Sequence, residues 1–187
     1  MMKRETRKNG RKKMRNKDLQ LVTDLSFIAG ESAAKTAENE AFRDFLKHSD
    51  IELDSLVHEL NGEIEPLIDC TACGNCCRSL MINVSADEAQ SLAERLHTSL
   101  AAVKEKYLEE STGGMLVINT IPCHFLADNK CTIYENRFAD CREFPHLHKN
   151  GFHQRIFGTL MHYGRCPIIY NVMEALKQHT KFVPELK

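Results

Sequence analysis

The chain has 187 residues, of which 27% are charged, and it holds eight cysteines and no tryptophan. This length supports one domain with a hydrophobic core plus a helical extension. No stretch approaches the roughly 18 apolar residues that a membrane span needs, and polar residues interrupt 19–30, where a signal peptide would be apolar. We therefore expect a cytoplasmic protein whose reduced cysteines bind metal and do not form disulfides.

Charge is divided unevenly along the chain. Residues 1–18 carry nine Lys or Arg against two acids, a net charge of +7, and the remainder carries −8. This segment has no apolar period and predicts a basic disordered tail. A weak contact with nucleic acid or an anionic surface is its alternative role, although no interleaved aromatic side chain indicates base stacking. The sequence identifies no protein partner.

The apolar residues of 19–69 recur at helical spacing and predict a helical extension. Within 19–48 we expect a break into two helices at Gly30, with Ser32 capping the second helix. The pattern repeats over 51–68, where Pro66 ends or kinks the helix just before the first cysteine. These helices carry no residue to which the sequence assigns chemistry.

Residues 70–178 predict a cysteine-cluster domain in which short strands and helices alternate. We expect a strand over 80–84 and then a helix from Ser85, whose capping box with Glu88 marks the first turn. This helix is expected to extend to about His97, and another is expected to follow it to residue 108. The expected core face of the first helix consists of Ala89, Leu92, Ala93 and Leu96.

The second half of this domain carries clear turn signals. Residues 115–118 predict a strand, and Asp128-Asn129 is expected to join the two arms of a β-hairpin. Residues 137–144 predict a helical turn that Pro145 ends.

The last part of the chain contains both an irregular stretch and a helix. Glycines recur through 146–164 and predict a loop. Cys166-Pro167 then begins a last helix, with proline in its first turn. With a C-terminal tail over 179–187, the expected fold is α+β, mainly helical, with a short β-hairpin and a metal-centred core.

Four sulfurs lie within eight residues, in Cys70-Thr71-Ala72-Cys73-Gly74-Asn75-Cys76-Cys77. Thiolate is a soft ligand that suits zinc or an iron–sulfur cluster. Two cysteines separated by two residues can bind one ion across a tight turn, and glycine supplies a permissive backbone for that turn. Because Cys76 and Cys77 are adjacent, their side chains should diverge, and we expect Cys77 to point away from Cys76.

Several spaced motifs follow one another in the order typical of a known family. They are Cys70-x2-Cys73-x2-Cys76-Cys77, Pro122-Cys123-x-Phe125-Leu126, Cys131-x-Ile133-Tyr134-Glu135 and Cys141-Arg142-x-Phe144-Pro145. In these motifs the chain resembles the YkgJ-like, or CxxCxxCC, family of zinc- or iron-chelating domains, over about Cys70 to Pro167. One departure is Phe138, where the family usually has proline. The resemblance implies that the metal ligands are Cys70, Cys73, Cys76, Cys77, Cys123, Cys131, Cys141 and Cys166.

Eight thiolates can complete two four-coordinate ions or contribute to a single polynuclear centre. The first three cysteines, followed much later by Cys166-Pro167, are arranged like the three-plus-one ligands of a bacterial ferredoxin cluster. This predicts one group of Cys70, Cys73, Cys76 and Cys166. The remaining four, Cys77, Cys123, Cys131 and Cys141, are then predicted to form a second, structural group. The choice between zinc, iron and an iron–sulfur cluster stays open.

An iron–sulfur redox protein or a cluster-dependent modifying enzyme is the alternative function. A similar cysteine cluster occurs in some flagellin lysine methylases, although the chain has no dinucleotide-binding glycine motif and no radical-SAM cysteine triad. His124 is a candidate base beside Cys123. Four histidines are candidate zinc ligands, and three arginines are candidates for offsetting the negative charge of metal-bound thiolates. The alternative for both groups is an ordinary surface role. These residues are His146, His148, His153 and His162, and Arg78, Arg137 and Arg142.

Overall fold

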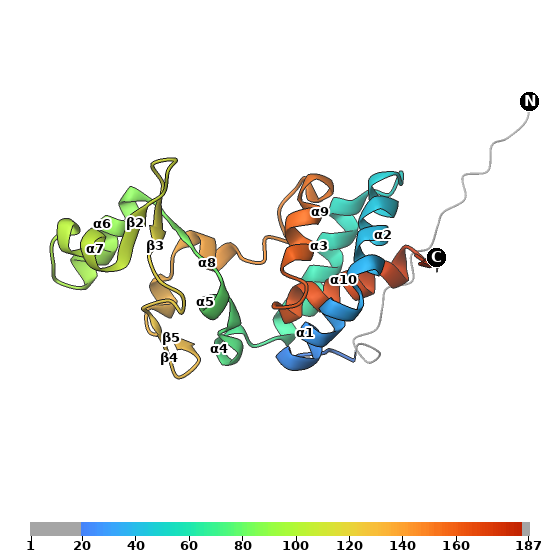
Figure 1. Ribbon diagram of the computed structural model, residues 1–187, viewed down its shortest axis with the longest axis horizontal. Coiled ribbons are helices and arrows are strands. Elements are labelled where there is room, and N and C mark those ends of the chain that lie inside the picture. The colour runs from blue at the N-terminus through green and yellow to red at the C-terminus, as the bar shows by residue number, and fades with distance from the viewer. Residues whose placement is uncertain (1–19, 185–187) are drawn as a thin grey trace, which may run out of the picture.

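The computed structural model describes residues 20–184, and the predicted basic tail, residues 1–18, lies outside this range. Helices dominate and the strands are few, short and antiparallel, which confirms the mainly helical α+β class. The elements form two lobes, seen side by side in Figure 1. The helical lobe comprises α1–α3, α9 and α10, and the cysteine lobe comprises α4–α8 with β1–β5. Over the described residues, no helix is both long and apolar enough to span a membrane.

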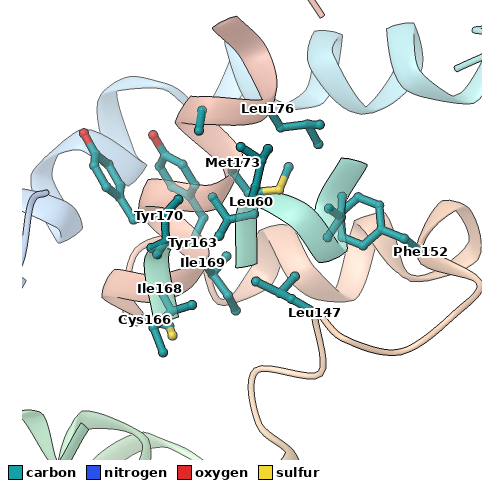
Figure 2. Close-up of a cluster of buried hydrophobic side chains, with 14 of the residues drawn as sticks. Leu60, Leu147, Phe152, Tyr163, Cys166, Ile168, Ile169, Tyr170, Met173 and Leu176 are labelled. Atoms are coloured by element: carbon teal, nitrogen blue, oxygen red, sulfur yellow. The ribbon is translucent and has the colours of Figure 1, made fainter. Parts of the chain in front are cut away.

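The helical lobe is built from both ends of the described chain. Its elements are α1 (Leu25–Ala34), α2 (Thr36–Lys47), α3 (Leu53–Ile64), the 3-10 turn η1 (Glu65–Leu67), α9 (Phe152–Met161) and α10 (Pro167–His179). Helix α10 packs against α3, and α9 packs against α2 and α3. Their apolar faces form one core, part of which Figure 2 shows. Its fully buried side chains include Ile28, Phe42, Leu46, Leu60, Ile64, Phe152, Ile156 and Ile169.

The first two helices divide at a different residue from the one expected. Gly30 lies inside α1, and the break falls at Lys35, which has no side-chain capping bond. The prediction that Ser32 caps the second helix is therefore wrong. Asp24 caps α1 instead, because its carboxylate accepts a hydrogen bond from the Phe27 N–H. A Cβ atom at Gly30 would meet nothing within 4 Å, and α1 continues through this residue without a break.

The predicted loop over 146–164 is wrong, because most of it forms helix α9. Its inward face places Phe152, Ile156 and Thr159 at helical spacing in the core. The Asp54 carboxylate of α3 accepts hydrogen bonds of 2.7 and 2.8 Å from the Gly151 and Phe152 N–H groups, so the helix start is satisfied from another element. The three glycines of this stretch concealed the period, and tertiary packing prevails over their low helix propensity.

A buried network of charges joins α1, α2 and α10. Lys177, whose side chain is 7% exposed, lies 2.7 Å from Glu38 and 2.7 Å from Glu174. Lys35 pairs with Glu174 at 2.8 Å, and the Tyr163 hydroxyl donates to the same carboxylate. Because these groups satisfy one another inside the lobe, they fix how α10 sits against the first two helices.

The cysteine lobe consists of short elements. They are α4 (Cys70–Cys73), α5 (Asn75–Ser79), β1 (Asn83–Val84), α6 (Ala86–Arg95), α7 (Leu100–Tyr107), β2 (Leu108–Glu110), β3 (Leu116–Ile118), β4 (Leu126–Ala127), β5 (Lys130–Cys131), η2 (Tyr134–Asn136) and α8 (Ala139–Glu143). Strand β3 lies between β1 and β2 in an antiparallel sheet, with Val84 opposite Leu116 and Leu108 opposite Ile118. Strands β4 and β5 pair as the predicted hairpin, with Leu126 opposite Cys131.

Most local predictions for this lobe hold. The Ser85–Glu88 capping box is present at the start of α6, and α8 occupies the predicted helical turn. Phe138, the departure from the family pattern, caps α8 with φ −56°, close to the value that proline would impose. Leu96 is 36% exposed, so its assignment to the core face is wrong, because α6 ends at Arg95.

Candidate metal centre

Two residues determine the local shape of the cysteine-rich turn, one at each end of α4. The Asp69 side chain accepts a hydrogen bond from the Thr71 N–H and starts the single turn of α4. Gly74 ends it with φ +58°, a left-handed value that glycine adopts without strain, and α5 follows at once. The two turns carry Cys70 and Cys73 on α4, and Cys76 and Cys77 on α5.

Gly74 also lets the turn pack closely on the hairpin. A Cβ atom at Gly74 would lie 2.6 Å from the Asn129 carbonyl oxygen, which is closer than real Cβ atoms approach. Asp128 and Asn129 have φ values of 47° and 66°, so the hairpin turns through two left-handed residues. The Cys123 N–H donates to the Cys77 carbonyl oxygen over 2.8 Å. These contacts bring the later cysteines beside the clustered four.

The first cysteine group lies where the two lobes meet. Cys70, Cys73 and Cys76 line a small cavity of about 30 Å³ together with Cys166. Cys166 is the N-cap residue of α10, and Figure 2 shows it at one edge of the helical-lobe core. Leu80, Phe144 and Ile168 complete the apolar wall of this cavity. The fold thus brings the predicted group of Cys70, Cys73, Cys76 and Cys166 to one place, although 90 residues separate Cys76 from Cys166.

The second group lines a larger cavity of about 560 Å³ in the cysteine lobe. Its four members, Cys77, Cys123, Cys131 and Cys141, come from α5, the segment before β4, β5 and α8. Cys70 and Cys76 also line this cavity, whereas Cys166 does not. The two cavities are therefore neighbours that share part of one wall.

The sulfur atoms of Cys76 and Cys77 lie 4.0 Å apart, so the expectation that Cys77 points away from Cys76 is wrong. The rotation between successive helical residues separates the Cα–Cβ bonds, but rotation of the side chains still brings the sulfurs together. All eight cysteines are free thiols. Within residues 20–184, no three His, Cys, Asp or Glu side chains converge as a ready-made metal site.

Burial and neighbouring thiols separate the pKa values of these cysteines. The hydrogen bond between the Cys76 and Cys77 sulfurs, with Arg137 nearby, lowers the pKa of Cys76 to about 7. The same hydrogen bond and burial raise the pKa of Cys77. Burial raises the pKa of Cys70 to about 11 and those of Cys141 and Cys166 to about 12. A metal ion reverses such increases, because it binds the deprotonated thiolate.

Arginine side chains surround the two cavities without carboxylate partners. Arg137 and Arg142 line the larger cavity, and the Arg137 guanidinium stacks 3.9 Å from the centre of the Tyr134 ring. Arg78 donates to the Cys73 carbonyl oxygen, and Arg165 lines the small cavity. In the described part of the chain none of these four forms a salt bridge. Positive charge beside the cysteines would offset the negative charge of thiolates that bind a metal. Arg165 was missed from the sequence although it immediately precedes Cys166.

The histidines lie away from the cysteine cavities. His146 and His162 pack edge-on against Phe144 and line a separate cavity in which no cysteine takes part. His148 and His153 are exposed. His124 is also exposed, and its Nε2 lies 2.7 Å from the Asn119 side-chain oxygen. The structure therefore brings none of the candidate histidines to the lining of either cysteine cavity.

Comparison with known proteins finds a family match for the cysteine-rich part of the chain. Residues 69–160 match the model of the CxxCxxCC family, described as "Putative zinc- or iron-chelating domain". Seven of the eight cysteines lie inside this match, and Cys166 lies beyond its end. No curated protein and no solved structure matches the chain. The resemblance seen in the sequence is confirmed over residues 69–160, which match the model of the CxxCxxCC family.

Proposed function

We propose that this chain is a metal-binding protein that chelates zinc or iron through its eight cysteines. The observation that carries the proposal is that all eight are free thiols lining two adjacent cavities. The family model that residues 69–160 match supports the same two metals.

The donor set fits these metals. Sulfur ligands suit zinc and iron–sulfur clusters, whereas magnesium and calcium prefer oxygen ligands. Each cavity is lined by at least four cysteines, the number that a closed zinc site or a cubane cluster requires. The unpaired arginines around them would offset the negative charge of a metal bound by four thiolates.

An iron–sulfur cluster in the first group is the second candidate. Cys70, Cys73 and Cys76 follow the short spacing of ferredoxin ligands, and Cys166 precedes Pro167 as the remote ligand does. Their common cavity supports this arrangement. A cluster there would give the chain a redox role or a part in a cluster-dependent modifying enzyme.

Elemental analysis of the full chain purified without oxygen tests the proposal. We expect zinc or iron in stoichiometric amount, and visible absorption distinguishes an iron–sulfur cluster from zinc, which is colourless. Cys73→Ser should lower the metal content, whereas Ala72→Ser, which adds a hydroxyl at an exposed neighbouring position, should not. A parent protein that stays metal-free after supply of both metals would overturn the proposal.

We also propose a cytoplasmic location for the protein and a binding role for its basic segment, residues 1–18. Eight unpaired cysteines suit the reducing cytoplasm, where disulfides are rare. Residues 1–18 are proposed to make a weak electrostatic contact with nucleic acid or another anionic surface. Binding of the full chain to DNA and to anionic vesicles at rising salt, compared with a chain lacking 1–18, tests this contact. Equal binding by the two chains would remove it.

A further inference from the structure

Cys76 occupies a special place between the two cysteine groups. It lines the small cavity with the first group and the large cavity with the second. Cys70 also lines both cavities, but Cys76 alone among the described cysteines has its sulfur within hydrogen-bonding distance of a second-group sulfur, that of Cys77. Cys76 therefore faces both groups at the point where they meet.

The separation of these two sulfurs matches that of two ligands of one ion. Thiolates bound to zinc at about 2.3 Å in a tetrahedral arrangement lie roughly 3.8 Å apart. The Cys76 and Cys77 sulfurs are 4.0 Å apart. Cys76 can thus share an ion with Cys77 while it still stands three residues from Cys73, at the spacing of a second ion's ligands.

We propose that Cys76 bridges the two metal positions, binding one metal with Cys70, Cys73 and Cys166 and another with the second group. This inference rests on the proposed metal-binding function and extends it from two separate sites to one coupled centre. A thiolate sulfur has enough lone pairs to bind two ions. The second position then has five sulfurs around it, so loss of Cys76 leaves four sulfurs there and three at the first position.

Titration of the metal-stripped full chain with Cd²⁺ tests the bridge, because cadmium binds thiolates and the bond absorbs in the near ultraviolet. The parent should bind two ions. Cys70→Ser should lose one ion, and Cys77→Ser, the adjacent matched control, should lose at most one. Cys76→Ser should lose the ion of the first group and also weaken the binding of the remaining ion, which keeps only its own four sulfurs, Cys77, Cys123, Cys131 and Cys141. A Cys76→Ser variant whose remaining ion is bound as tightly as in Cys70→Ser would overturn the bridge, and so would a Cys70→Ser variant that loses both ions.

Cadmium NMR of the unmutated chain keeps the test independent of whether Cys76→Ser folds. Two cadmium nuclei that share a sulfur split each other's resonances, whereas nuclei in separate sites do not. We expect two split resonances. Two unsplit resonances would refute the bridge and leave the metal-binding function intact, whereas a parent chain that binds no Cd²⁺ would refute both.

Discussion

The side-chain amide of Asn75 donates a hydrogen bond of 2.7 Å to the backbone carbonyl oxygen of Arg165. Asn75 begins α5 in the cysteine lobe, and Arg165 immediately precedes Cys166 at the start of α10 in the helical lobe. This bond therefore holds the cysteine-rich turn against the residue that brings Cys166. It arranges the first cysteine group in advance of metal, and preorganisation of ligands lowers the cost of binding.

Asn75→Ala should weaken metal binding at the first group. Loss of one hydrogen bond costs about 1 kcal/mol, which corresponds to roughly a fivefold lower affinity. Competition with a chelator measures it, and Asn150→Ala, at an exposed position of the helical lobe, is the control. Equal affinities for the two variants would show that the bond to Arg165 does not position the ligands.

Metal removal should affect the two lobes unequally. The helical-lobe core contains Cys166 but none of the other cysteines, whereas Cys123, Cys131 and Cys141 pack against the cysteine-lobe core. Because metal binding couples to the folding of small cysteine-rich units, chelation should raise amide exchange in α4–α8. Amides of α3 and α10 should stay protected. Uniform loss of protection across both lobes would contradict this expectation.

Two glycine substitutions should change stability in opposite directions. Gly74→Ala places a Cβ atom 2.6 Å from the Asn129 carbonyl oxygen on a backbone with φ +58°, so it should destabilise the cysteine lobe by more than about 1 kcal/mol. Gly62→Ala, in helix α3 with no atom near its Cβ position, should stabilise the chain by about 0.5–1 kcal/mol. Thermal unfolding of the metal-loaded variants measures both. A stabilised Gly74→Ala would contradict the close approach to Asn129.

Local sequence signals predicted much of this fold. The capping box at Ser85, the hairpin at Asp128-Asn129 and the proline-started last helix all depend on neighbouring residues, and all three are present. Helix α9 was missed because glycines conceal its helical period. The contact that satisfies its first N–H groups comes from Asp54, about 100 residues earlier, and no local pattern reveals it.

In the candidate site, too, local sequence predicted some features, and others depend on tertiary structure. Spacing and family resemblance identified the eight cysteines and suggested two groups. The position of Cys76 between the groups was not foreseen, because the rule that neighbouring side chains diverge describes Cβ directions and leaves the sulfur positions free. The adjacency of the two cavities depends on how the lobes meet, which is a tertiary property.

Stability of the helical lobe should fall at acidic pH through Asp54. Hydrogen bonds from the Gly151 and Phe152 N–H groups lower the pKa of this carboxyl below its usual 3.8. Its contribution is therefore present above the unfolded-state pKa near 4 and is lost as pH falls through the lower folded value. Asp54→Ala should cost about 1 kcal/mol at pH 7 and flatten the pH dependence below 4. Urea unfolding across this range tests it, with exposed Asp50→Ala as the control.

The last prediction concerns the buried network around Lys177. Its ammonium lies 2.7 Å from the carboxylates of both Glu38 and Glu174 and is largely shielded from water. Lys177→Met keeps the side-chain length but leaves these carboxylates short of a positive charge, which should lower the free energy of unfolding by roughly 3 kcal/mol. Lys47→Met, at an exposed position of α2, should change it by less than about 0.5 kcal/mol.

A second change separates charge from packing in this network. Adding Glu38→Gln to Lys177→Met removes one uncompensated carboxylate, so the double variant should be more stable than Lys177→Met alone. If the loss instead came from poor packing of methionine against Phe42 and Tyr163, whose rings face the Lys177 ammonium, the second substitution would give no recovery. Urea unfolding of the parent, both single variants and the double variant completes the cycle. A double variant less stable than Lys177→Met would show that the network is not held by charge pairing.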